Sequence, residues 1–158
     1  MDAEKRVAIA EVCPSGAIRY RRNDGRPNES PPPVNLTAIR EGGPCAVLAG
    51  RRQGFGMTLC RCGASKDKPF SDCSHHDVKC DASGEPPTGQ ADMLAVRDGP
   101  LNTDPQTDGP LRVRGNLEST GGTGRVLARV QGATPCCCGR SAHKPFCDGT
   151  HARVCFKS

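Results

Sequence analysis

The sequence predicts a small, mainly-β protein with little helix, held together by cysteine-rich loops rather than by a large hydrophobic core. Of its 158 residues only 35% are apolar and 3% aromatic, whereas 11 are cysteine, 19 glycine and 14 proline. A chain this poor in apolar residues usually needs disulfides, a metal or oligomerisation to hold its fold. No apolar run in the sequence approaches the roughly 20 residues that span a bilayer. A helical bundle and a transmembrane protein are therefore excluded, and a large α/β enzyme is disfavoured.

An internal duplication organises the chain. Residues 60–75 read CRCGASKDKPFSDCSH and residues 136–151 read CCCGRSAHKPFCDGTH, so nine of sixteen positions are identical at a constant shift of 76. Upstream of these segments, Gly43–Val47 matches Gly109–Val113 in pattern. Each half therefore opens with a short strand and closes with a Cys/His-rich loop.

The remaining elements follow from periodicity and composition. Strands are predicted at Met93–Val96, Leu111–Arg114 and Val126–Val130. Loops are predicted where Pro, Gly, Asp and Ser gather, at residues 23–33, 81–90 and 102–109. Gly121–Gly124 predicts a hairpin turn, because no Lys-Ser/Thr follows it as in a phosphate-binding loop. Helix is expected only at Lys5–Val12 and as a turn after each Cys/His loop.

The cysteines are best interpreted as metal ligands or reactive thiols. The first residues include Asp2 and Glu4 and lack the apolar stretch of a secretory signal, and the cysteine count is odd. A disulfide framework is therefore not expected, and we expect a cytoplasmic protein, with a mitochondrial location as the alternative. The net charge is +5, and the densest basic cluster, Arg19–Arg22, has one aromatic residue. A solvated loop explains it better than a nucleic-acid surface, so neither nucleic acid nor a membrane is an expected partner.

The second Cys/His segment offers four metal ligands in two pairs. Cys136 and Cys138 are two residues apart, so in an extended segment they point to the same side. Cys147 and His151 are four apart, so a helical turn would put them on one face. A structural Cys3His zinc site is one interpretation, although zinc ligands usually have Cys-x2–4-Cys spacing. A disulfide cluster is disfavoured by the compartment. A [2Fe–2S] cluster, with one ligand pair on each iron, is the interpretation we favour.

The segment from Cys136 to His151 resembles the motif of the CDGSH iron–sulfur (NEET) family. It matches Cys-x-Cys-x2-Ser-x3-Pro-x-Cys-Asp-Gly-Thr-His at every specified position. The resemblance implies a [2Fe–2S] cluster held by Cys136, Cys138, Cys147 and His151, with supporting roles for Ser141, Pro145 and Asp148. The duplicated form resembles the tandem-motif members of that family. This implies a monomer folded as a pseudo-dimer, with CDGSH-type modules at residues 41–97 and 98–158.

The N-terminal 40 residues carry a second, partial resemblance. Residues 13–18, Cys-Pro-Ser-Gly-Ala-Ile, resemble the closing motif of a divergent single-cluster ferredoxin domain. The next cysteine is Cys45, so Cys13 alone cannot hold a cluster. Residues 1–40 are interpreted as a truncated remnant followed by a Pro-rich loop. A helix end followed by a turn is the alternative for residues 13–18.

The first Cys/His segment departs from the motif. Ser71 replaces the third cysteine and Cys73 replaces the glycine, while Cys60, Cys62 and His75 are in place. A serine hydroxyl is a hard donor that suits iron in a sulfur-rich cluster poorly. Three outcomes stay open: a weakened cluster held through Cys73 or Ser71, zinc or another metal, or no metal. Ligation through Cys73 is slightly favoured. The other thiols are treated as non-ligands, namely Cys45, Cys80, Cys137 and Cys155.

These residues predict a [2Fe–2S] protein for one-electron transfer, redox sensing or cluster transfer. One cluster is expected in the second motif, and a second cluster in the first motif is an open question. The expected partner is a redox protein or a cluster acceptor. A structural zinc module that mediates contacts is the rival. An enzyme is not expected, because His76 and His143 are the only histidines outside the ligand set and no acid–base pattern accompanies them.

Overall fold

The computed structural model describes residues 3–11, 20–26, 33–51, 54–89 and 91–158. Most of the regular structure is one six-stranded sheet with two short helices. In chain order the elements are α1 (Ala3–Glu11), β1 (Leu36–Ile39), β2 (Cys45–Arg51), β3 (Gly54–Leu59), β4 (Asn102–Pro105), β5 (Leu111–Thr120), β6 (Val126–Ala133) and α2 (Thr150–Arg153). The prediction of a small, mainly-β fold with little helix and two tandem modules is confirmed.

The duplication seen in the sequence recurs in the strand pairing. In the first half β1 runs antiparallel to β2, with Leu36 opposite Leu48 and Ile39 opposite Cys45. In the second half β4 pairs with β5 in the same way at positions 66 residues further on, from Asn102 opposite Arg114 to Pro105 opposite Leu111. Each module is thus a strand, a hairpin and a Cys/His loop.

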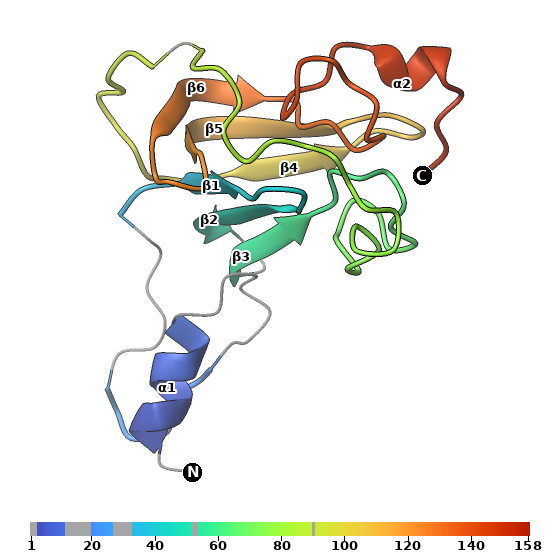
Figure 1. Ribbon diagram of the computed structural model, residues 1–158. Coiled ribbons are helices and arrows are strands. Elements are labelled where there is room, and N and C mark those ends of the chain that lie inside the picture. The colour runs from blue at the N-terminus through green and yellow to red at the C-terminus, as the bar shows by residue number, and fades with distance from the viewer. Residues whose placement is uncertain (1–2, 12–19, 27–32, 52–53, 90) are drawn as a thin grey trace.

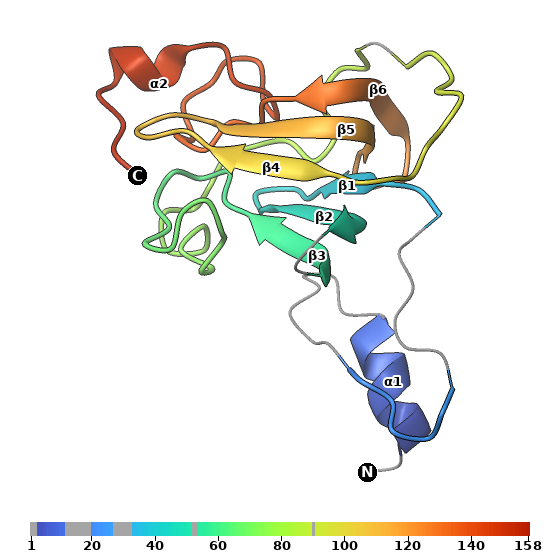
Figure 2. The same cartoon turned by 180° about the vertical axis from the view of Figure 1, so that it is seen from behind.

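Strand β5 joins the two modules into one sheet. One part of β5, residues 111–114, pairs with β4, while residues 118–120 pair in parallel with β1 of the first module. Strand β6 covers the other edge of β5. As a result the two Cys/His loops emerge at the same end of the sheet, as Figures 1 and 2 show from opposite sides.

A single cluster of buried apolar residues is built from both modules. Its members include Ile39, Val47 and Leu59 from the first half and Leu111 and Leu127 from the second. Each of these side chains is at most 2% exposed. Since each module contributes part of this cluster, neither half would bury its own apolar residues alone.

Several expectations on the elements can be compared with the structure. The strands around residues 111–114 and 126–130 are confirmed as parts of β5 and β6. The helix predicted at residues 5–12 is confirmed by α1 up to residue 11, and residue 12 lies outside the described residues. The hairpin turn at Gly121–Gly124 is also confirmed, because Gly121 N–H donates to the Arg125 carbonyl at 2.9 Å and β5 and β6 flank it. The predicted loop at residues 102–109 is wrong in part, because Asn102–Pro105 form β4.

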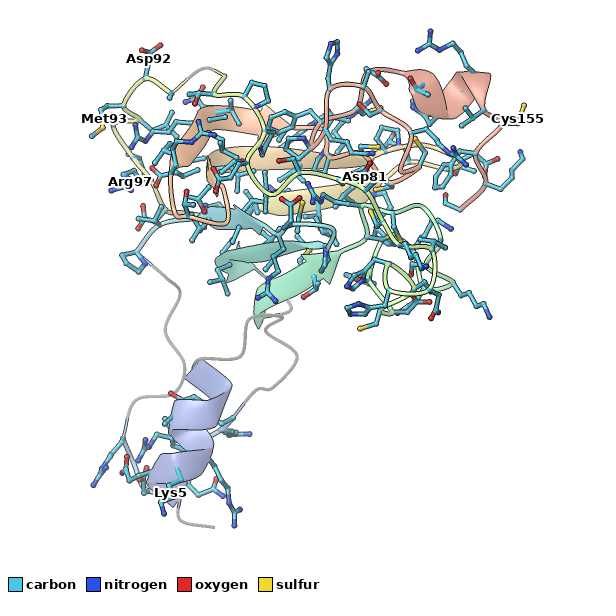
Figure 3. The ribbon with its side chains drawn as sticks, in the orientation of Figure 1. Lys5, Asp81, Asp92, Met93, Arg97 and Cys155 are labelled. Atoms are coloured by element: carbon cyan, nitrogen blue, oxygen red, sulfur yellow. The ribbon has the colours of Figure 1, made fainter. Side chains whose placement is uncertain are left out.

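The predicted strand at Met93–Val96 is wrong. These residues form no strand, and Met93 and Val96 are 75% and 54% exposed. Figure 3 labels Met93 on a loop beside the sheet. Hydrogen bonds fix the two ends of the loop: Arg97 donates to Glu118, and Arg129 donates to the Ala91 carbonyl. The loop is therefore held by polar contacts at its ends, and its apolar side chains have no partner strand.

The module boundaries at 40/41 and 97/98 stay predictions, although the sheet includes Leu36–Ile39, which precede the first of them. The ferredoxin-like segment at residues 13–18 lies outside the described residues. Within the part of the chain that is described, no helix is long and apolar enough to cross a membrane.

Candidate metal centre

The two Cys/His loops have the same backbone structure. Cys60 N–H donates to the Pro69 carbonyl at 2.9 Å, and Cys136 N–H donates to the Pro145 carbonyl at 2.8 Å. A second pair of bonds fixes the position of the third ligand: Ser71 N–H donates to the Thr58 carbonyl at 2.9 Å, as Cys147 N–H does to Thr134 at 2.7 Å. The substitutions at positions 71 and 73 therefore leave the register of the first loop unchanged.

A buried serine side chain fixes the backbone of each loop. Ser141 Oγ donates to the Phe146 carbonyl at 2.6 Å and accepts from His143 N–H at 3.1 Å. Ser65 makes the same two bonds in the first loop. The supporting role expected for Ser141 is thus to tie the two sides of the loop together.

Asp148 and Asp72 cap the turn that carries the last ligand. Hydrogen bonds from Thr150 and then from Ala142 N–H lower the pKa of Asp148 well below its usual range. In the first loop Lys66 N–H and Ser74 lower the pKa of Asp72 in the same way. Both carboxylates therefore stay ionised at neutral pH and bind backbone N–H groups on both sides of the loop.

The four ligands expected in the second loop are grouped as two close pairs. Cys136 Sγ and Cys138 Sγ are 3.6 Å apart, and Cys147 Sγ is 3.2 Å from His151 Nδ1. Two thiolates on one tetrahedral metal with bonds of about 2.3 Å lie about 3.7 Å apart. Each pair thus has the spacing of two ligands on a single metal ion.

Backbone amides face the sulfur atoms of this loop. Arg140 N–H donates to Cys138 Sγ and Gly149 N–H donates to Cys147 Sγ, each at 3.4 Å. Burial raises the pKa of Cys138. A thiolate at this position therefore requires compensation by a nearby cation as well as by these amides.

The first loop keeps one close pair and one incomplete pair. Cys60 Sγ and Cys62 Sγ are 3.5 Å apart, and Ala64 N–H donates to Cys62 Sγ at 3.4 Å. His75 Nδ1 is buried and has no hydrogen-bond partner among the described residues. Burial, aided by His76, lowers the pKa of His75, which favours the neutral imidazole that binds metals. Cys60, Cys62 and His75 thus fit a metal centre with one ligand missing.

The two substituted residues, Ser71 and Cys73, keep the positions that their counterparts have in the second loop. Cys73 is exposed and has a φ of 73°, close to the 85° of Gly149 at the matching position of the second loop. Ser71 is half-buried at the position of Cys147. Whether Cys73 or Ser71 binds a metal stays a prediction.

Arg61, between the two ligand cysteines of the first loop, is a feature that the sequence analysis missed. Its side chain is 2% exposed, and it donates to the carbonyls of Gly43 at 2.8 Å and of Ala82 at 3.1 Å. It also donates to the carbonyls of Arg40 and Ser83. The matching residue of the second loop is Cys137, which is buried in the apolar cluster. The first loop thus has a buried guanidinium at the position where the second loop has a buried thiol.

The remaining described cysteines differ in their surroundings. Burial raises the pKa of Cys45 to about 12 and that of Cys137 to about 11, so both stay thiols at neutral pH. Cys155 is exposed and points away from the molecule in Figure 3. Cys80 lines a cavity together with Cys62 and Cys138.

The donor sets of the two loops are made of close pairs of side chains rather than of larger clusters. In the described ranges no three His, Cys, Asp or Glu side chains lie close enough to share one ion. The fold and site thus define a small β protein with two Cys/His metal-binding loops, of which the second has two ligand pairs and the first has one pair and a single histidine.

The comparison with protein families identifies this class. The sequence profile described as "Iron-binding zinc finger CDGSH type" matches the chain twice, at residues 16–76 and 108–152, and so covers more than half of it. The chain belongs to this CDGSH-type iron-binding family and carries its domain in tandem. A search of curated proteins found no significant match.

Proposed function

We propose that the chain binds a [2Fe–2S] cluster in its second loop and uses it in one-electron transfer, redox sensing or cluster transfer. Cys136 and Cys138 would hold one iron, and Cys147 and His151 the other. When bound, such a cluster supplies a centre that gains or loses one electron. The observation that carries the proposal is the separation of the ligands into two pairs, each at tetrahedral spacing.

The same observation disfavours the rival, a structural zinc module. One zinc ion needs all four ligands at mutual distances of about 3–4 Å. In the part of the chain that the structure describes, no three such side chains approach one point. The amides at Cys138 and Cys147 also suit a cluster, because hydrogen bonds to the sulfur ligands raise its reduction potential.

The different burial of the four ligands supports transfer of an electron, or of the cluster itself, to a partner at one edge of the cluster. Cys136 and Cys138 are 1% and 7% exposed, whereas Cys147 and His151 are only half-buried. A redox protein or a cluster acceptor would therefore approach from the side of Cys147 and His151. We place this role in a cytoplasmic monomer without enzymatic activity, with a mitochondrial location as the alternative.

For the first loop we propose a weaker cluster held by Cys60, Cys62 and His75. Cys73 is the favoured fourth ligand, and Ser71 is the alternative. The buried, partnerless Nδ1 of His75 supports a metal at this loop. The positive φ of Cys73 and the exposure of its side chain mean that ligation would require a local rearrangement of the turn.

The proposal is tested by exchanging the imidazole ligand for a thiolate. His151→Cys should keep the iron and sulfide of the second loop and lower the reduction potential, because a thiolate adds negative charge to the iron. His143→Ala, at an exposed histidine of the same loop, is the control and should leave the potential unchanged. A potential that does not respond to His151→Cys would contradict ligation by His151. The absence of any redox-active centre would favour the zinc module.

A further inference from the structure

The two halves differ at one position behind the Cys/His loops. Cys80 and Phe156 are matching residues, since each donates its N–H to the carbonyl of the last ligand of its loop, His75 or His151, at 3.0 and 3.1 Å. Phe156 packs against the apolar cluster, and its ring lies 5.2 Å from Lys68 Nζ of the opposite loop. Cys80 has no ring to fill the corresponding space.

A cavity lies where a second phenylalanine would be. It has a volume of about 380 Å³ and is lined by residues 78–81, which include Cys80, and by Cys62 and Cys138 with the two residues that follow each of them. Sites for small molecules commonly measure about 300–1,000 Å³, so this cavity has room for one.

The charges around the cavity are mainly positive. Lys79, Arg140 and Lys144 line it, and Asp81, labelled in Figure 3, is the single acidic residue among its lining. Lys144 is the counterpart of Lys68. Lys68 Nζ donates to the Ser65 carbonyl at 2.8 Å and contacts the ring of Phe156, whereas Lys144 has neither contact among the described residues. An ammonium group that has an aromatic partner in one half is thus without one in the other.

We propose that this cavity binds a small planar aromatic anion, which lies over Lys144 as Phe156 lies over Lys68. A ring over the ammonium provides a cation–π interaction, and the acidic group of the ligand faces Lys79 and Arg140. The ligand would contact Cys62 and Cys138, one from each loop. The site goes beyond the proposed function, because it rests on the difference between Cys80 and Phe156 and not on the use of a metal in either loop.

The experiment titrates the purified, metal-loaded protein with 1-naphthoate and follows binding by calorimetry. Binding should be detected with a dissociation constant below about 1 mM and should be at least about tenfold weaker for acetate and for neutral 1-naphthalenemethanol. Cys80→Phe, which copies the other half of the molecule, should weaken binding at least about tenfold by filling the cavity. Lys144→Met should weaken it as well and leaves the cavity in place.

Cys155→Phe is the matched control, because the same change is made at an exposed position outside the cavity lining and should leave binding unchanged. The metal content and the visible spectrum of each variant show whether its loops are intact. Equal affinity of Cys80→Phe and the parent protein for 1-naphthoate would overturn the proposal. So would the absence of binding at about 10 mM ligand. Loss of the metal in Cys80→Phe would leave Lys144→Met as the deciding variant, with unchanged affinity overturning the proposal.

Discussion

Gly63 and Gly139 lie against each other where the two Cys/His loops meet. A Cβ added to Gly63 would overlap the Cys138 carbonyl group, 2.7 Å from its carbon, and a Cβ added to Gly139 would lie 2.6 Å from the Cys62 carbonyl carbon. Both glycines have a positive φ, 81° and 73°. The contact is reciprocal, as expected across a pseudo-twofold axis, and it couples the two metal-binding loops.

Gly139→Ala should therefore destabilise both loops together. A positive φ in a non-glycine residue costs about 1–2 kcal/mol, and the overlap with Cys62 adds to that. We expect a loss of more than about 2 kcal/mol in the free energy of unfolding and faster loss of metal from both loops. Denaturant unfolding and metal release measure these effects.

Gly124→Ala is the matched control for Gly139→Ala. Gly124 has a φ of 84°, but nothing lies within 4 Å of the place that a Cβ would take, so the substitution introduces backbone strain without a clash. It should cost about 1 kcal/mol and leave metal release unchanged. Equal effects of the two substitutions would mean that the contact between the loops contributes nothing to the free energy of unfolding or to metal retention.

The role of Cys73 can be separated from its effect on the backbone. Cys73→Gly should relieve the strain at φ 73° and raise stability by about 1 kcal/mol, whereas Cys73→Ala retains the strain. If Cys73 is a ligand, both variants lose the metal of the first loop, as measured by iron and sulfide content. Cys155→Ala, at another exposed cysteine with positive φ, is the control. Unchanged metal content in Cys73→Ala would rule out Cys73 as a ligand.

Ser71→Cys restores the third ligand of the first loop. Ser71 already occupies the place of Cys147, with the same backbone hydrogen bond, so the new thiol should complete the pair with His75. We expect metal content to rise to that of two full loops and metal release from the first loop to slow by about tenfold or more. An unchanged release rate would show that the missing cysteine ligand is not what makes the first loop release its metal faster.

The lowered pKa of Asp148 predicts that the stability of the protein depends on pH in a specific way. Its pKa is lowered in the folded state, so its contribution to stability is complete above the unfolded value of about 4 and is lost as the pH falls through the folded value. Asp148→Asn should therefore melt at a lower temperature than the parent protein at pH 7, and the difference should shrink below about pH 4. Circular dichroism melts at several pH values test this.

Asp92→Asn serves as the control for that series. Asp92 lies on an exposed loop, labelled in Figure 3, and the change should leave the melting temperature unaltered at each pH. A difference between Asp148→Asn and the parent protein that stays constant down to about pH 3 would contradict the role of the ionised carboxylate.

Arg61 should be the most sensitive position of the first loop outside its ligands. Its guanidinium satisfies four backbone carbonyls, and removing it leaves buried acceptors that cost about 1–3 kcal/mol each. Arg61→Met should therefore lower the free energy of unfolding by about 3 kcal/mol or more, and Arg61→Lys by less. Arg112→Met, on an exposed strand position, is the control. A loss in Arg61→Met no greater than in the control would contradict this account.

The repeat and its ligands could be predicted from the sequence because they rest on local spacing. The pairs Cys136–Cys138 and Cys147–His151 were predicted from the two-residue and four-residue separations, and the structure brings each pair together. Strands β1 and β4 could not be predicted in this way. Asn102–Pro105 is polar and contains proline, and it forms a strand because β5 offers an open edge.

Long-range contacts account for the other differences. Arg61 follows a cysteine in a polar loop, and nothing in the local sequence indicates that four carbonyls from residues 40–43 and 82–83 surround it. The identity of Gly63 and Gly139 in the aligned repeats was a signal for their contact, because a glycine needed for close approach recurs in both halves. The cavity beside Cys80 becomes visible only when its counterpart Phe156 is placed in three dimensions.

The central claim, that the paired ligands hold a [2Fe–2S] cluster, is tested most directly by measuring iron, acid-labile sulfide and zinc per chain on anaerobically purified protein, together with its visible spectrum. We predict about two irons and two sulfides per chain if the second loop alone is loaded, and about four of each if both loops are. In either case the protein should be coloured, and Cys147→Ala should remove the iron of the second loop. Zinc without sulfide in a colourless protein would contradict the account.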